Sequence, residues 1–177
     1  TQVDLYGNNI GDTGAAALGE AFKVNTGITE VDLGHNNIGA TGAAALGEAF
    51  KVNTSITRVY LNRNKIGATG AAALGEAFKV NTTITVVGLH GNNITRLPAS
   101  LAQNRTITNF FYWDNPIDYI PPSVQRWLRR FQQQQNANIY NDSQNVHNRR
   151  IQQCVSDSME RIMNEGPPCY ESIEQVH

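Results

Sequence analysis

The sequence predicts an α/β solenoid, in which β-α units form a right-handed superhelix with a curved parallel sheet on the concave side and helices on the convex side. Three observations predict this fold. The stretch Gly-Ala-Ala-Ala-Leu-Gly-Glu-Ala-Phe-Lys-Val-Asn-Thr occurs three times unchanged, beginning at Gly14, Gly42 and Gly70. Its period of 28 residues is typical of stacked supersecondary units. Within each period, the apolar spacing changes from that of a strand to that of a helix.

The second unit shows both spacings. Val31 and Leu33 alternate with Asp32 and Gly34, and this period of two predicts a short strand. Leu46 and Phe50 are one helical turn apart, and three alanines keep that helix slim. Extending the alignment along the chain predicts strands centred on residues 3–5, 31–33, 59–61, 87–89 and 110–112, and helices near 12–23, 40–51 and 68–79.

The strand segments share the frame Leu-x-x-Leu-x-Leu-x-x-Asn-x-Leu, which resembles the leucine-rich repeat. Complete frames start at Ile28, Ile56, Ile84 and Ile107, and a partial frame starts at Val3. The resemblance covers about residues 1–120, and the 28-residue period with a helical return is similar to the ribonuclease-inhibitor-like subclass. The last frame follows after only 23 residues, so we expect residues 95–106 to be extended or to form one 3₁₀ turn.

The same resemblance implies a ladder of asparagines where the chain leaves each strand. An asparagine amide has donors and an acceptor, and it can therefore pair buried backbone groups of adjacent units. The positions that match the frame are Asn8, Asn36, Asn64, Asn92 and Asn115. A polar binding site lined by these asparagines is the weaker interpretation.

The C-terminal third has no repeat. Residues 121–131 start with Pro-Pro-Ser and carry one apolar stripe, which predicts a helix that caps the last repeat. The arginines beside the stripe leave a membrane or an acidic partner as a weaker alternative. Residues 132–177 are predicted to hold a polar linker or frayed helix end and then a second helix starting near Asp142, and their weak final pattern is typical of disorder. His147 and Cys154 lie roughly 10 Å apart on one face of that helix, too far to form a nucleophile pair.

Composition narrows the function. A formal net charge of −1 gives no electrostatic footprint for nucleic acid, and no apolar run is long enough to span a membrane. The cysteines and histidines have no metal-ligand spacing, so we expect neither a metal nor another cofactor. Disulfide-bonded end caps are missing, which favours a cytoplasmic location. Sequons at Asn53, Asn81, Asn93, Asn104 and Asn141 argue only weakly for glycosylation, because the first two belong to the repeat.

The chain begins at Thr1, inside the first predicted strand. We therefore expect it to be a fragment of a longer intracellular protein. A solenoid that starts this way presents an apolar end and an unpaired strand edge. Self-association through this N-terminal edge is a further hypothesis.

Differences between the units fall mainly on outward strand positions, whereas exposed helix residues such as Glu48 and Lys51 do not change. Strands lie about 4.8 Å apart and packed helices about 8–10 Å apart, so the array must curve with its strands inside. We predict that this concave strand face binds a protein partner, although unconstrained drift of exposed positions is an alternative. The predicted surface consists of Tyr6, Glu30, Asp32, His35, Arg58, Tyr60, Asn62, Arg63, His90, Asn109, Phe111, Trp113 and Asp114.

The leading hypothesis is a protein-interaction module without catalytic activity. The alternative is the substrate-recognition part of an enzyme, such as a ubiquitin ligase, with its chemistry in or beyond the C-terminal segment. Tyr60, Phe111 and Trp113 are the expected energetic centre of the surface, because aromatic side chains dominate binding hot spots. A competing explanation is that residues 132–177 fold back and cover Phe111 and Trp113.

Overall fold

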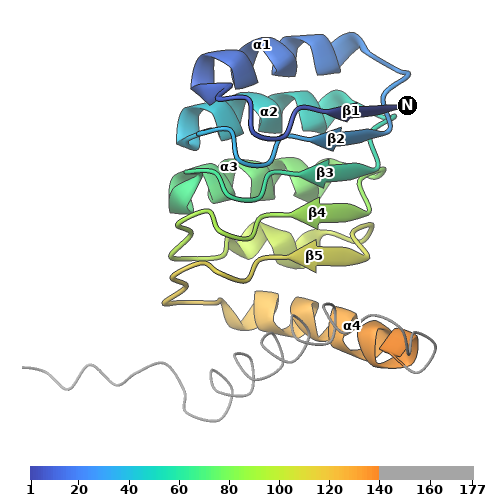
Figure 1. Ribbon diagram of the computed structural model, residues 1–177. Coiled ribbons are helices and arrows are strands. Elements are labelled where there is room, and N and C mark those ends of the chain that lie inside the picture. Colours follow the sequence, from blue (N-terminus) through green and yellow to red (C-terminus); the bar gives the residue numbers. More distant parts are fainter. Residues whose placement is uncertain (140–177) are drawn as a thin grey trace, which may run out of the picture. The chain divides into compact units, whose positions relative to one another are not determined.

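The computed structural model describes residues 1–139, with side chains up to residue 131. These residues form a stack of strands, each of the first four followed by a helical return (Figure 1). The second C-terminal helix, the His147–Cys154 pair and the predicted disordered end lie outside the described residues. The elements in order are β1 Gln2–Asp4, α1 Gly11–Val24, β2 Glu30–Asp32, α2 Ala40–Val52, β3 Arg58–Tyr60, α3 Gly67–Val80, β4 Val86–Gly88, the 3₁₀ helix η1 Ala99–Gln103, β5 Asn109–Phe111 and α4 Pro122–Ile139.

The strands form one parallel sheet in the order β1-β2-β3-β4-β5, which confirms the predicted solenoid. Each strand lies one residue earlier in the chain than the predicted range. Hydrogen bonding nevertheless continues past the strand, since Leu33 N–H donates to the Tyr60 carbonyl at 2.8 Å. The helices α1, α2 and α3 form a second layer on one side of the sheet (Figure 1). The predicted short fourth return is confirmed by η1.

The core lies between the sheet and the helices. Val31, Leu33 and Ile56 from the strand side, and Leu46 and Phe50 from α2, have no exposed surface. No single unit could bury these side chains alone, because each unit supplies only part of the apolar layer. Stacking of consecutive units therefore provides the main hydrophobic stabilisation.

The asparagine ladder predicted at the strand ends is present. Asn64 Oδ1 accepts hydrogen bonds from the N–H groups of Asn36 and Ile38, at 3.0 and 2.9 Å. Its Nδ2 donates to the carbonyls of Leu33 and Leu61, each at 2.9 Å. One buried amide thus pairs backbone groups of two consecutive units, which would otherwise be costly to bury.

A second asparagine column, which the sequence reasoning missed, lies where the helices end. Asn53 Nδ2 donates to the carbonyls of Phe22 and Asn25, and its Oδ1 accepts from the N–H of Ile56 at 2.8 Å. Asn81 makes the equivalent contacts one unit later. Both side chains are buried, so glycosylation at these two sequons is incompatible with the folded repeat. The signal was available in the repeated Asn-Thr-x-Ile joint.

Helix α4 covers the end of the last repeat. Val124, Trp127, Leu128 and Phe131 are all buried, and the Trp127 indole N–H donates to the Asn104 carbonyl at 3.0 Å. The helix continues past the predicted range 121–131, through residues predicted to be a linker or frayed end, because glutamine is a good helix former. None of the helices in residues 1–139 has the length and hydropathy needed to span a bilayer.

Candidate protein-binding surface

The parallel register aligns the predicted surface residues in columns. We use "strand face" for the side of the sheet opposite the helices. Strand pairing puts Gln2, Glu30, Arg58, Val86 and Asn109 in one column, and Asp4, Asp32, Tyr60, Gly88 and Phe111 in the next. Backbone hydrogen bonds continue the register beyond the strands, from His35 N–H to Asn62 O, from Arg63 N–H to His90 O and from Gly91 N–H to Trp113 O.

An aromatic cluster, defined here as Tyr60, His90, Phe111 and Trp113, lies at the β3–β5 end of the strand face. The rings of His90 and Trp113 stack with centroids 4.7 Å apart, and Trp113 meets Phe111 edge to face at 5.2 Å. All four side chains are partly exposed. Such ring pairs hold one another in place and leave apolar area available for a ligand.

The glycine at position 88 makes room for the Tyr60 ring. A Cβ atom built on Gly88 would lie 3.1 Å from Tyr60 Cδ1, which is tighter than ordinary contacts. The Tyr60 ring therefore leans over Gly88, on the strand between Tyr60 and Phe111. This arrangement places the Tyr60 ring over β4, the strand that separates β3 from β5.

A smaller ring pair lies at the other end of the strand face. Tyr6 stacks on His35 with centroids 5.9 Å apart, and Tyr6 is 46% exposed. A Cβ on Gly34 would lie 2.8 Å from Tyr6 Cδ2 and 2.9 Å from Asn62 Nδ2. The absence of a side chain at Gly34 thus allows the Tyr6 ring to lie across the sheet.

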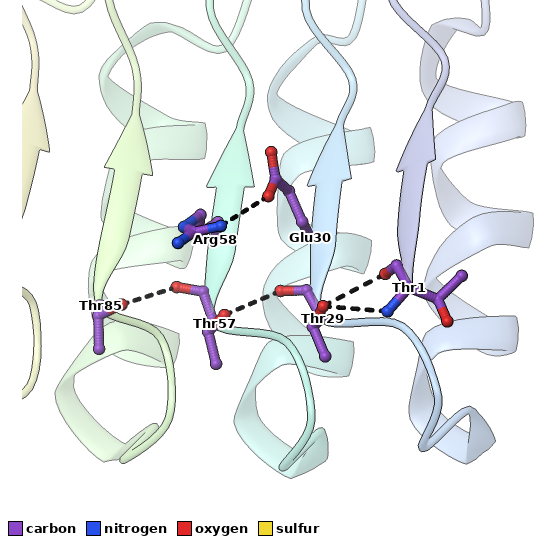
Figure 2. Close-up of polar contacts among 6 residues, drawn as sticks. All are labelled: Thr1, Thr29, Glu30, Thr57, Arg58 and Thr85. Atoms are coloured by element: carbon purple, nitrogen blue, oxygen red, sulfur yellow. Dashed lines mark hydrogen bonds and ion pairs between the residues drawn. The ribbon is translucent and has the colours of Figure 1, made fainter.

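Acidic side chains dominate the β1–β2 end of the face. Arg58 Nη1 lies 2.9 Å from Glu30 Oε2, and this ion pair bridges β2 and β3 (Figure 2). Asp4 and Asp32 are direct neighbours in the register. Burial raises the pKa of Asp32, the hydrogen bond from Gly34 N–H opposes this, and the charges of Asp4 and Glu30 raise the pKa further. Like charges directly opposite each other on neighbouring strands repel, so the Asp4–Asp32 pair is a feature that stability of the fold alone would not favour.

Three charged or titratable residues of the predicted surface have left-handed backbone conformations. The φ angles are 57° at His35, 54° at Arg63 and 56° at Asp114, in the loop column where Gly7 and Gly91 stand in other units. Glycine adopts this conformation without steric cost, whereas other residues are strained there. The larger side chains are therefore kept at a cost to stability, which is typical of functional positions.

A row of threonines crosses the beginnings of the strands and was not predicted from the sequence. The Thr57 hydroxyl donates to the Thr29 carbonyl at 3.0 Å, and the Thr85 hydroxyl donates to the Thr57 carbonyl at 3.2 Å (Figure 2). Thr108 continues the row. These hydroxyl groups pair with backbone carbonyls of the preceding unit, so they help to fix the register at the beginnings of the strands.

The remaining predicted residues are on the same face. Asn109 is partly buried, and its Oδ1 accepts a hydrogen bond from the Thr108 hydroxyl at 2.9 Å. The proposed cover of Phe111 and Trp113 by residues 132–177 lies outside the described side chains. Among the described residues, no group of three histidine, cysteine, aspartate or glutamate side chains is placed to hold a metal ion.

Comparison with known proteins agrees with this geometry. Residues 1–19, 24–47 and 52–75 match the family profile described as Leucine Rich repeat. The chain is a leucine-rich repeat protein. The 28-residue period and the α-helical returns are those of the ribonuclease-inhibitor-like subclass. No curated protein sequence matches the chain.

Two solved structures share the fold of the leucine-rich repeat array. One is described as leiomodin-1 actin-binding site 2, with a TM-score of 0.58 and 20% identity, over 80% of this chain and 86% of that one. The other is the C-terminal domain of tropomodulin from Caenorhabditis elegans, with a TM-score of 0.61 and 14% identity, over 80% of this chain and 90% of that one. At these sequence identities, the likeness shows a shared fold and does not identify a ligand of this chain.

Proposed function

We propose that this leucine-rich repeat array binds a protein ligand on its strand face, with the aromatic cluster as the energetic centre. The observation that supports this most is the stack of His90 on Trp113, with Phe111 packed against the Trp113 edge. Tyrosine and tryptophan are enriched in binding hot spots because they bury a large area and keep a polar group. Ring packing also fixes the side chains beforehand, which lowers the entropy lost on binding.

The surroundings of the cluster support the same function. The leucine-rich repeat places a wide strand face opposite the helices, and this is the surface that solenoids use for extended ligands. Charged residues at Arg63 and Asp114 border the cluster and occupy strained left-handed positions. A polar rim around an apolar centre is the usual composition of a protein interface.

A peptide-binding experiment with the full chain tests this proposal. Binders are selected from a displayed library of random peptides, and the most enriched peptide is titrated by fluorescence polarisation. The double variant Tyr60→Ala/Trp113→Ala should weaken binding by about 1,000-fold, since two hot-spot truncations at about 2 kcal/mol each cost about 4 kcal/mol together. The variant Glu48→Ala, on the helix side, should bind as tightly as the wild-type chain.

The melting temperature decides between binding and internal packing. If the cluster serves a ligand, the double variant loses peptide binding and keeps the wild-type melting temperature. If Phe111 and Trp113 are instead covered by residues 132–177, the double variant melts at a lower temperature and its peptide affinity does not change. The second result would contradict the proposed function.

A further inference from the structure

The strand face carries two chemically different halves next to each other. Asp4, Glu30 and Asp32 lie on β1 and β2, and the aromatic cluster lies on β3 to β5 and in the loops that follow them. Building on the proposed function, we propose that the ligand is a basic amphipathic protein segment, which presents a lysine or arginine to Asp4 and Asp32 and an apolar side chain to the aromatic cluster.

The acidic pair has a charge that the described residues leave uncompensated. Arg58 is engaged by Glu30, and no lysine or arginine of the described residues forms an ion pair with Asp4 or Asp32. One oxygen of each carboxylate accepts a backbone hydrogen bond, Asp4 from Tyr6 N–H at 3.0 Å and Asp32 from Gly34 N–H at 2.8 Å. These bonds fix the orientation of the carboxylates, and the second oxygen of each accepts no hydrogen bond from the described residues.

The register sets the separation of the two halves. Asp32 and Tyr60 are partners on neighbouring strands, so their Cα atoms are separated by about 4.8 Å. Phe111 lies two strands further in the same column, which gives about 14 Å from Asp32. An extended segment covers this distance in four to five residues, at about 3.3 Å per residue. One short peptide can therefore contact both halves at once.

The charge of the strand face favours some chemical classes of ligand over others. Three carboxylates against one paired arginine repel phosphate groups, so a nucleic acid or an anionic lipid surface would be disfavoured. An arginine or lysine gains from the carboxylates and also from the face of a neighbouring aromatic ring. The combination of acid and aromatic groups therefore complements a cationic side chain that is followed by an apolar one.

Substitutions that keep the shape isolate the charge. In Asp4→Asn/Asp32→Asn, the new amide oxygens can still accept the Tyr6 and Gly34 N–H bonds, and only the negative charges are removed. The matched control Glu20→Gln/Glu48→Gln removes two charges from exposed ion pairs on α1 and α2. Both variants have the same net charge. A difference in peptide binding between them therefore depends on where the charges were removed and not on the net charge of the chain.

The test uses peptides of about 12 residues, which span roughly 40 Å when extended, displayed as a random library over the full wild-type chain and over each variant. Peptides selected by the wild-type chain should be enriched in lysine or arginine together with an aromatic or aliphatic residue. This enrichment should disappear with Asp4→Asn/Asp32→Asn and persist with the control. The best wild-type peptide should bind Asp4→Asn/Asp32→Asn at least about 10-fold more weakly, which corresponds to a loss of about 1.4 kcal/mol of binding free energy.

Salt gives a second readout, because exposed charges are screened at distances beyond the Debye length. Raising ionic strength from about 0.05 M to about 0.5 M should weaken peptide binding to the wild-type chain more than to Asp4→Asn/Asp32→Asn. If selected peptides need Tyr60 and Trp113 but show no basic enrichment and no such salt difference, the ligand class is wrong and the proposed function stands. If binding is unchanged in Tyr60→Ala/Trp113→Ala as well, both are wrong.

Discussion

The imidazole ring of His90 lies almost parallel to the indole of Trp113, with an interplanar angle of 8° and a centroid distance of 4.7 Å. The two residues belong to consecutive repeats, and the backbone bond from Gly91 N–H to Trp113 O at 3.1 Å fixes their relative position. Stacking partly shields His90 from water, and its Nδ1 is buried with no hydrogen-bond partner among the described residues. The candidate surface therefore includes a titratable ring whose pKa is lowered by burial.

Protonation of His90 should destabilise the folded chain. Burial lowers the pKa of His90, the charge of Arg63 lowers it further, and Asp114 acts in the opposite direction. Below the ordinary pKa of 6.5, the unfolded chain binds a proton before the folded one does, so the free energy of unfolding falls as the pH decreases from there toward the lowered pKa.

Chemical denaturation at a series of pH values measures this effect. The variant His90→Phe keeps a ring that can stack on Trp113 but cannot be protonated. Between pH 6.5 and about pH 5, a range in which histidine is the side chain that titrates, its stability should decrease less than that of the wild-type chain. Identical pH dependence in the two proteins would show that His90 is not held in its neutral form by the fold.

The asparagine ladder predicts a large effect for a small change. Asn64→Ala removes an amide that pairs two backbone N–H groups and several carbonyls. Buried backbone groups left without partners should lower the free energy of unfolding by about 1–3 kcal/mol. Glu48→Ala removes only an exposed ion pair with Lys51 and should change it by less than about 0.5 kcal/mol. Equal denaturation midpoints would refute the ladder.

Tyr112 occupies the position that Leu33, Leu61 and Leu89 have in the other repeats. Its hydroxyl is buried without a partner among the described residues, and burial raises its pKa to about 12. Tyr112→Phe should increase the free energy of unfolding by about 1 kcal/mol, because it removes an unpaired polar group and keeps the ring that packs on Phe110. Thermal unfolding gives the comparison, and a less stable variant would mean that the hydroxyl is paired in solution.

The charged form of Asp32 is expected to lower the free energy of unfolding. Burial, Asp4 and Glu30 raise its pKa against the opposing hydrogen bond from Gly34 N–H, so the folded chain holds this proton more tightly than the unfolded one. The free energy of unfolding therefore decreases as the pH rises from 3.8 through the raised pKa. Asp32→Asn should be more stable than the wild-type chain at neutral pH, and the difference should vanish in acid. A melting temperature below that of the wild type at pH 7 would contradict this.

The repeat made most of the fold predictable from the sequence. Identical segments with one period require one shape, so the register of the five strands followed from aligning five frames. Departures from the repeat were harder to interpret. Ala40 stands in the second unit where the first has Asp12, and only the structure shows that Asp12 Oδ1 accepts the N–H groups of Gly39 and Gly42 at the start of α2.

The details of the surface depended on conformations that residue identity does not reveal. Alignment placed Tyr60 and Phe111 in one column, yet the lean of Tyr60 over Gly88 depends on free space above a neighbouring strand. The left-handed conformation at His35 and Arg63 was hidden because only Gly7 and Gly91 mark it in the sequence. The His90–Trp113 stack likewise depends on side-chain rotamers, which periodicity does not determine.

The two tryptophans allow the central proposal to be tested in one spectrum. Trp127 is buried, and its indole N–H donates to the Asn104 carbonyl, whereas Trp113 lies partly exposed on the strand face. In a ¹H–¹⁵N correlation spectrum of the full chain, with indole signals assigned by Trp113→Phe, addition of a selected peptide should shift the Trp113 indole signal and leave that of Trp127 unchanged. A peptide that binds without shifting the Trp113 signal would contradict binding on the aromatic cluster.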